Sequence, residues 1–126
     1  MFKEVIISII IVISIVGLDF ITQNYTKATV AQTSSMLSDL KEKIKKDEEN
    51  ISNNIEDIYQ KWEERRKKLA YFIEHDELEK VETKITNIKT FIEVEDLEMA
   101  ISSIDEAEFI LEHIKEKNAF NLENIF

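Results

Sequence analysis

The apolar and polar positions divide the chain into one long uncharged run followed by shorter amphipathic segments. Residues 5–18 carry no charge and are mostly isoleucine and valine. Phe20 and Ile21 extend the run beyond Asp19, so it covers about 17 residues, or roughly 25 Å as a helix. This length is near the lower limit for crossing a bilayer. The pattern predicts a transmembrane anchor at residues 5–21.

A cleaved signal peptide is the competing interpretation, because it also has a short basic start and an apolar core. Cleavage needs small residues just after the core, and residues 19–25 offer no such site. The nearest candidate, Thr29-Val30-Ala31, lies more than ten residues further along. We therefore expect an uncleaved anchor. Lys3 precedes the span and Asp19 stands near its other end, which predicts that residues 1–4 are cytoplasmic and that the domain after the span lies outside the cytoplasm.

The next segment, residues 22–35, is rich in Thr, Ser, Gln and Asn and has no apolar stripe. This composition predicts a polar linker, or a frayed continuation of the anchor helix. An acidic helical domain is then expected at residues 36–126, outside the cytoplasm. Ser34 or Ser35 is expected to cap its first helix. The apolar positions of that helix are Leu37, Leu40 and Ile44.

Two interpretations remain open for residues 35–74. A seven-residue repeat of apolar positions indicates one long helix with a heptad seam. The repeat is interrupted by Lys41 and Glu48, and the polar stretch Asn50–Asn54 is typical of a turn. We favour two antiparallel helices, the second from about residue 54 to 74. The positions of the repeat are Leu37, Ile44, Ile51, Ile58 and Phe72.

Clearer stripes predict the remaining helices. Asp76 is expected to cap a helix whose apolar residues recur every three or four positions, and Asp96 the last helix, which runs to about Lys117. Short connections make neighbouring helices antiparallel. The apolar tail, residues 120–126, is expected to dock on the bundle. The fold class is all-α: an N-terminal transmembrane helix followed by a small antiparallel bundle of three to four helices. Core residues expected to meet are Trp62, Phe72, Ile85, Ile88, Ile104 and Leu111.

Composition supports this fold class. The chain has no proline, no cysteine and one glycine, Gly17, so glycine-rich phosphate loops, tight hairpins and disulfides are excluded. The net charge is −10. Up to Lys68 the chain has eleven Lys and Arg residues and eleven Asp and Glu residues. From Leu69 onward it has five Lys and Arg residues and fifteen Asp and Glu residues. This excess argues against nucleic acid or anionic lipid as a partner of the second half.

Motifs for catalysis or metal binding do not stand out. The two histidines, His75 and His113, lack the spacings of zinc proteases and di-iron bundles. His75 with Glu77 is half a metal site at most, and a cap or a surface hydrogen bond is the favoured interpretation. We expect no catalytic residue, no cofactor and no metal. The basic run of residues 65–68 is expected to pair with the glutamates four positions earlier rather than with nucleic acid.

Several blocks of the second half resemble an uncharacterised Gram-positive bacterial family of short membrane-anchored all-helical proteins. The similarity covers about residues 34–126 and implies architecture and a cell-membrane location, but no activity. The blocks are Trp62, Tyr71–Leu78, Phe91–Glu93, Phe109–Ile114 and Leu122-Glu123-Asn124-Ile125. The candidate structural or interaction residues are Trp62, His75, Glu77 and Asn124.

Two functional hypotheses remain. The first is a non-enzymatic, membrane-anchored interaction or scaffold domain outside the cytoplasm, whose partner is a membrane or envelope protein and not nucleic acid. The alternative is an extracytoplasmic domain that senses a small ligand or ion, which needs an open groove between helices. An enzyme has no positive support in the sequence.

Overall fold

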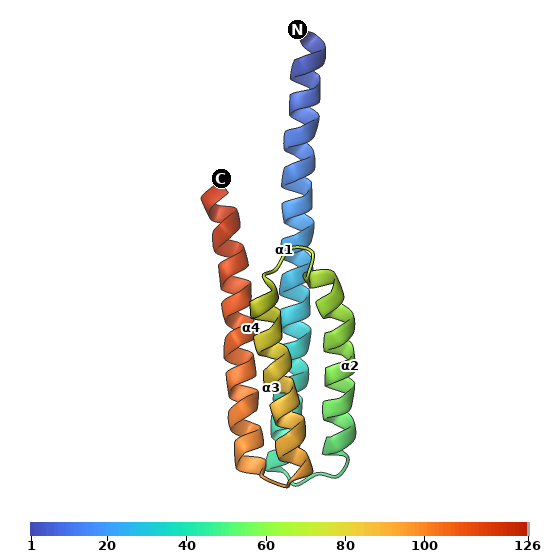
Figure 1. The fold of residues 1–126 in the computed structure, drawn as a ribbon, viewed down its shortest axis with the longest axis vertical. Helices are drawn as coiled ribbons and strands as arrows, with labels where there is room; N and C mark the ends of the chain where they lie inside the picture. The colour runs from blue at the N-terminus through green and yellow to red at the C-terminus, as the bar shows by residue number, and fades with distance from the viewer. Residues whose placement is uncertain (126) are drawn as a thin grey trace.

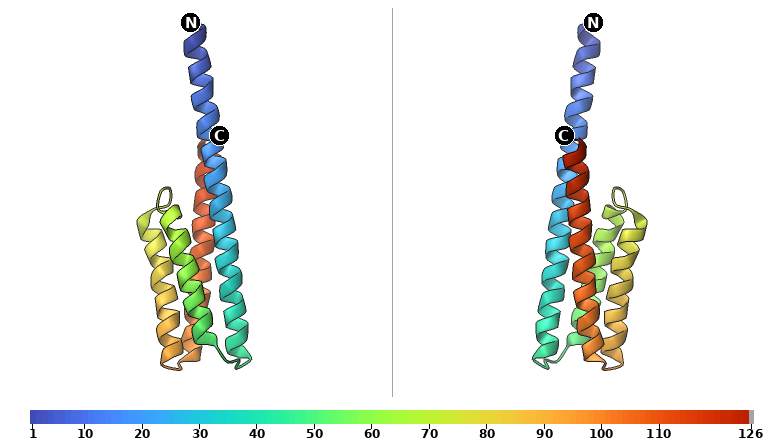
Figure 2. Two further views of the ribbon diagram at one scale, coloured as in Figure 1. Left: turned by 90° about the vertical axis from the view of Figure 1, so that its right-hand side faces the viewer. Right: turned by 90° about the vertical axis from the view of Figure 1, so that its left-hand side faces the viewer.

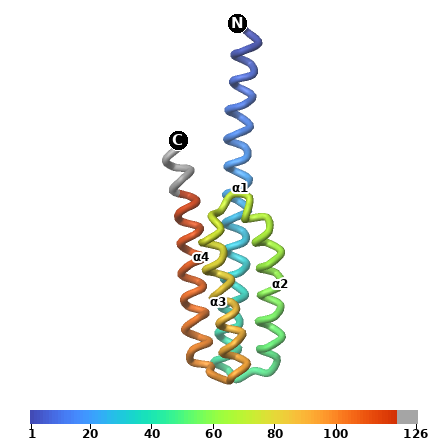
Figure 3. The backbone as a smooth tube through the Cα atoms, in the orientation of Figure 1, coloured from blue at the N-terminus to red at the C-terminus, as the bar shows by residue number. Residues whose placement is uncertain are grey.

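The described part of the chain forms four α-helices in a computed structural model. They are α1 (Phe2–Lys45), α2 (Ile51–Leu69), α3 (His75–Glu93) and α4 (Leu97–Ile125), as Figure 1 shows. The structure describes the backbone of residues 1–125 and the side chains of residues 1–119. The course of the chain can be followed in Figure 3.

The helices form an up-down-up-down bundle. α1 packs against α2 and α4, and α3 packs against the same two helices, so each helix contacts two neighbours. Two opposite views in Figure 2 show the α1–α2 and α3–α4 connections at one end and the α2–α3 connection at the other. Short connections of this kind join antiparallel helices. The predicted all-α class, with a long apolar first helix and an antiparallel bundle, is confirmed.

The first helix belongs both to the apolar segment and to the bundle. α1 is continuous over 44 residues, and its N-terminal part projects beyond the other helices (Figure 1). An 18-residue window there has a mean hydropathy of 2.7 and is not buried at all. By length and composition, this part of α1 is able to cross a bilayer.

The expected linker at residues 22–35 is instead a packed part of α1. Thr26 and Thr29 are fully buried, and Thr33 is 4% exposed. Threonine counts as polar, yet its methyl group packs in a core, and its hydroxyl can bond to its own helix. The Thr26 hydroxyl does so, donating to the Thr22 carbonyl at 2.8 Å. The bundle therefore starts about 14 residues earlier than predicted and joins the apolar segment without a break.

Over residues 35–74 the prediction of two helices is confirmed, although the break lies earlier than Asn50–Asn54. α1 ends at Lys45 and α2 begins at Ile51. The residues between them are all exposed, because they include no apolar side chain for the core. Asn50 adopts a left-handed conformation with φ 69°, which asparagine tolerates better than most residues.

Two other helix ends are closed without glycine. Asp47 after α1 (φ 56°) and Glu95 after α3 (φ 61°) are both left-handed. In each case the next residue donates its N–H to the carbonyl five positions back, at 3.0 and 2.9 Å respectively. This is the Schellman closure, in which glycine usually occupies the left-handed position. A chain with a single glycine can therefore still make compact connections.

The core contains five of the six residues predicted to meet there. Phe72 is the exception, because α2 ends at Leu69 instead of continuing to residue 74. The Ile73 N–H bonds back to the Leu69 carbonyl at 2.8 Å, which closes the helix. Phe72 is half-buried, and its ring lies edge-on to Tyr25 with the centroids 6.4 Å apart. The five buried residues are Trp62, Ile85, Ile88, Ile104 and Leu111.

One of the three predicted helix caps is confirmed. Ser34 and Ser35 cap no helix, because both lie inside α1, which runs unbroken from Phe2 to Lys45. Asp96 caps α4, since its Oδ1 accepts the Met99 N–H at 3.3 Å. Asp76 does not cap α3: the helix already begins at His75, and no side chain bonds its first turn. α4 continues beyond the expected end at Lys117, to Ile125. The predicted docking of the tail, residues 120–126, concerns side chains outside the described part.

Candidate functional site

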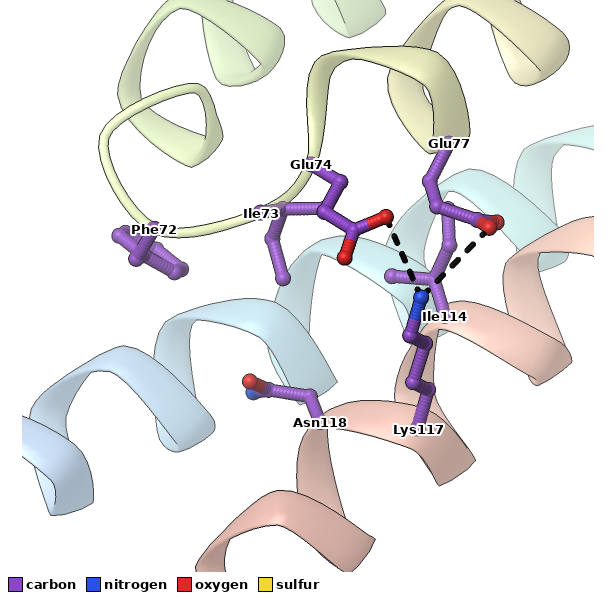
Figure 4. A pocket seen from close by; sticks show the side chains of 7 residues that line it. All are labelled: Phe72, Ile73, Glu74, Glu77, Ile114, Lys117 and Asn118. Carbon is purple, nitrogen blue, oxygen red and sulfur yellow. Dashed lines mark hydrogen bonds and ion pairs between the residues drawn. The ribbon is translucent and has the colours of Figure 1, made fainter.

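A small cavity lies at the end of the bundle nearest the apolar part of α1. It is partly open and is lined by the α2–α3 connection (residues 72–74), by Glu77 in the first turn of α3, and by one side of α4. Figure 4 shows these side chains converging from three segments of the chain. The contribution of α4 consists of Ile114, Lys117 and Asn118.

Lys117 holds the charged part of this cavity together. Its ammonium group lies 3.3 Å from a carboxylate oxygen of Glu74 and 3.9 Å from one of Glu77 (Figure 4). The Glu74 side chain is 69% exposed but that of Glu77 only 11%, and Lys80 lies 3.7 Å from the same Glu77 oxygen. A carboxylate in the first turn of a helix is also favoured by the helix dipole. The cluster therefore ties the start of α3 to α4.

The size of the cavity limits what it can bind. Its volume of about 50 Å³ has room for a few water molecules. Pockets for small organic ligands usually measure roughly 300–1,000 Å³. The cavity does not provide the groove that the sensing hypothesis requires.

His75 contacts Glu79 rather than Glu77, whose carboxylate lies near Lys80 and Lys117. The His75 side chain is 67% exposed, and its Nε2 lies 2.9 Å from a carboxylate oxygen of Glu79, one turn further along α3. In the part of the chain that the structure describes, no three His, Cys, Asp or Glu residues are grouped to hold a metal ion. His75 makes a surface contact.

The two remaining candidates are a core residue and a residue that cannot be placed. Trp62 of α2 is 1% exposed and packs in the core, with no acceptor for its indole N–H among the described residues. The side chain of Asn124 lies outside the described part. Sequence reasoning did not identify Lys117, because its partner Glu77 is forty residues away. Only the antiparallel pairing of α3 and α4 brings these two residues together.

The basic run at the end of α2 pairs differently from the prediction. Glu63 binds Arg66, which donates to both of its carboxylate oxygens at 3.1 and 2.9 Å and also lies 3.6 Å from Glu82 of α3. Glu63 was expected to pair with Lys67. It pairs with Arg66 instead, because the Glu63 and Arg66 side chains both lie toward α3. Within the described residues, neither Lys67 nor Lys68 has a carboxylate within 4.0 Å.

A family model described as Domain of unknown function (DUF4363) matches residues 20–125. The match begins close to the end of the apolar segment and includes residues 22–35, which agrees with the packing of that segment in the bundle. No curated protein and no solved structure matches the chain.

Proposed function

The chain belongs to the DUF4363 family of domains of unknown function, and we propose that it is a non-enzymatic, membrane-anchored scaffold or interaction domain. In this proposal residues 5–21 span the cell membrane once. The bundle stands outside the cytoplasm and binds a membrane or envelope protein beside it.

The continuity of α1 is the observation that carries the proposal. The apolar side chains from Val5 to Ile21 are all at least 40% exposed and have no cover within the described part of the chain. A contiguous apolar surface of this kind is unfavourable in water and suits a lipid environment. The same helix then supplies one wall of the bundle, so the bundle is held at a set height above the bilayer.

The orientation and the lack of an enzymatic role rest on separate support. Lys3 precedes the apolar segment and Asp19 stands near its other end, an asymmetry that favours a cytoplasmic N-terminus. Both histidines are exposed on the surface. An acid–base catalyst normally sits in a pocket with a partner that adjusts its pKa.

Crosslinking in the native membrane tests the proposal. Three forms of the full chain are compared: the wild type, a chain whose residues 5–21 are replaced by an unrelated span of equal length, and Leu111→Asp. Leu111 is fully buried, so an aspartate there unfolds the bundle but leaves the anchor unchanged. Partners are identified from equal amounts of membrane-inserted protein.

We expect the same partner with the wild type and with the exchanged span, and its loss with Leu111→Asp. Recovery that survives Leu111→Asp would show that the bundle does not recognise the partner. Failure to recover a partner with any of the three forms would contradict the proposal.

A further inference from the structure

We propose that the end of the bundle facing the apolar segment binds the phosphate groups of anionic lipids. The site consists of Arg65, Lys67 and Lys68 at the end of α2, beside Tyr25 of α1. The inference rests on the anchor in the proposed function and adds a second, electrostatic contact with the bilayer surface.

The fold brings these cations together around one aromatic ring. The guanidinium of Arg65 and the ammonium of Lys68 each lie 6.0 Å from the centroid of the Tyr25 ring on α1. Together with Lys67 they line a shallow, open hollow that contains a single acid, Glu64. The hollow is therefore basic, although the whole chain carries a net charge of −10.

These cations are free to meet an external anion. Arg65, Lys67 and Lys68 form no ion pair within 4.0 Å in the described part of the chain. The neighbouring Arg66 contrasts with them, because it is engaged by two carboxylates. Among the described side chains, Arg65 donates only to the Thr29 hydroxyl, at 3.3 Å, which orients its guanidinium toward α1.

The continuous helix sets the height of the hollow relative to the membrane. Tyr25 follows Ile21, the end of the apolar segment, by four residues, which is about 6 Å along a helix. The headgroup layer on each side of a bilayer is roughly 5–7 Å thick. The cations beside Tyr25 therefore lie at the depth of the lipid phosphates. Tyr71 of the nearby α2–α3 connection is 90% exposed, and tyrosine is enriched at this depth.

The position of three cations at the C-terminal end of α2 also suits the helix dipole. That effect does not account for the placement of Arg65 and Lys68 over the Tyr25 ring of α1. The acidic excess of the chain lies entirely from Leu69 onward. Two of these acids, Glu74 and Glu77, lie at the same end of the bundle as the hollow, but both are paired with Lys117. Acids more than about 8 Å away in water are largely screened at physiological salt.

The test measures lipid selectivity of the full chain in phosphatidylcholine bilayers. Trace spin-labelled phosphatidylglycerol and phosphatidylcholine report their relative association with the protein. Lys67→Gln/Lys68→Gln removes two cations from the site. Lys45→Gln/Lys46→Gln is the matched control, since both lysines are exposed and lie about 36 Å beyond Ile21, the end of the apolar segment. Lys67→Arg/Lys68→Arg retains the charge.

We expect the wild type to prefer phosphatidylglycerol, and Lys67→Gln/Lys68→Gln to lower that preference about twofold or more. Lys45→Gln/Lys46→Gln and Lys67→Arg/Lys68→Arg should both retain the preference for phosphatidylglycerol. Equal selectivity in all variants, or an equal loss in the control, would overturn the proposal. So would loss of selectivity on adding glycerol phosphate at constant ionic strength, because the site would then bind free phosphate. Flotation with vesicles separates the claims: a chain that does not float contradicts the anchor, and one that floats without selectivity contradicts only this site.

Discussion

Leu111 and Phe109 stand two positions apart in α4 and have opposite surroundings. Leu111 is fully buried in the core, whereas the larger Phe109 is 76% exposed. Burial and not size decides how much an apolar side chain contributes to stability. Substituting these two residues therefore tests which face of α4 packs against the bundle.

We expect Leu111→Ala to lower the free energy of unfolding by about 2–5 kcal/mol, because it leaves a cavity in a packed core. Phe109→Ala should change it by less than about 0.5 kcal/mol. Chemical denaturation of the two variants and the wild type, in the same detergent or bilayer mimic, checks both values. A larger loss for Phe109→Ala than for Leu111→Ala would mean that α4 is rotated about its axis.

At the scale of helix pairs, α2 and α3 are joined by two carboxyl groups that share one guanidinium. The paired hydrogen bonds from Arg66 lower the pKa of Glu63. Burial, followed by the neighbouring Glu63 carboxyl group, raises the pKa of Glu82. The two glutamates therefore contribute to stability with opposite signs at neutral pH.

Glu63→Gln should be less stable than the wild type by about 1 kcal/mol at pH 7, because a partly buried, charge-assisted hydrogen bond is lost. A lowered folded-state pKa contributes stability that is present above the ordinary glutamate range, about pH 4.3, and is lost as the pH falls through the folded-state pKa. The difference in the free energy of unfolding between Glu63→Gln and the wild type should therefore become smaller at acidic pH. Denaturation curves at several pH values measure it.

Glu82→Gln is the matched comparison. Ionised Glu82 is unfavourable in the folded state, so this variant should be as stable as the wild type at pH 7, or more stable. As the pH falls through the raised pKa of Glu82, the stability of the wild type should increase relative to that of Glu82→Gln. A loss of stability in Glu82→Gln at pH 7 that equals the loss in Glu63→Gln would contradict this assignment.

The helices differ in how well their sequences predict them. The core face of α3 is made of leucine, valine and isoleucine at intervals of three and four, so the pattern alone placed it correctly. The middle of α1 has the same spacing at Thr26, Thr29 and Thr33, which leads into Leu37. Because threonine counts as polar, the stripe was interpreted as a linker. A pattern that treats buried threonine like valine would have detected it.

The candidate site was less accessible to sequence reasoning than the helices. Glu77 was identified from a local block, but its partner Lys117 comes from a distant helix. The basic hollow likewise depends on Tyr25 of α1 meeting the end of α2. Such contacts are set by the order in which helices pack, and no short-range spacing contains that information.

At the scale of the whole molecule, the central claim is that one rigid helix joins the apolar segment to the bundle. The proposed scaffold role and the lipid contact both depend on it, because a flexible connection would leave the height of the bundle undefined. The chain has no cysteine, so pairs of spin labels can be introduced without background. Ser14 and Ser35 are exposed and lie on the two sides of residues 22–34.

The most direct test is the distance distribution between labels at Ser14→Cys and Ser35→Cys, measured by double electron–electron resonance on the full chain in nanodiscs. A continuous helix separates these positions by 21 residues, or about 32 Å along its axis. We predict one narrow distribution centred near that value. A broad distribution, or one centred at a much shorter distance, would contradict the continuous α1 and favour a flexible linker between anchor and bundle.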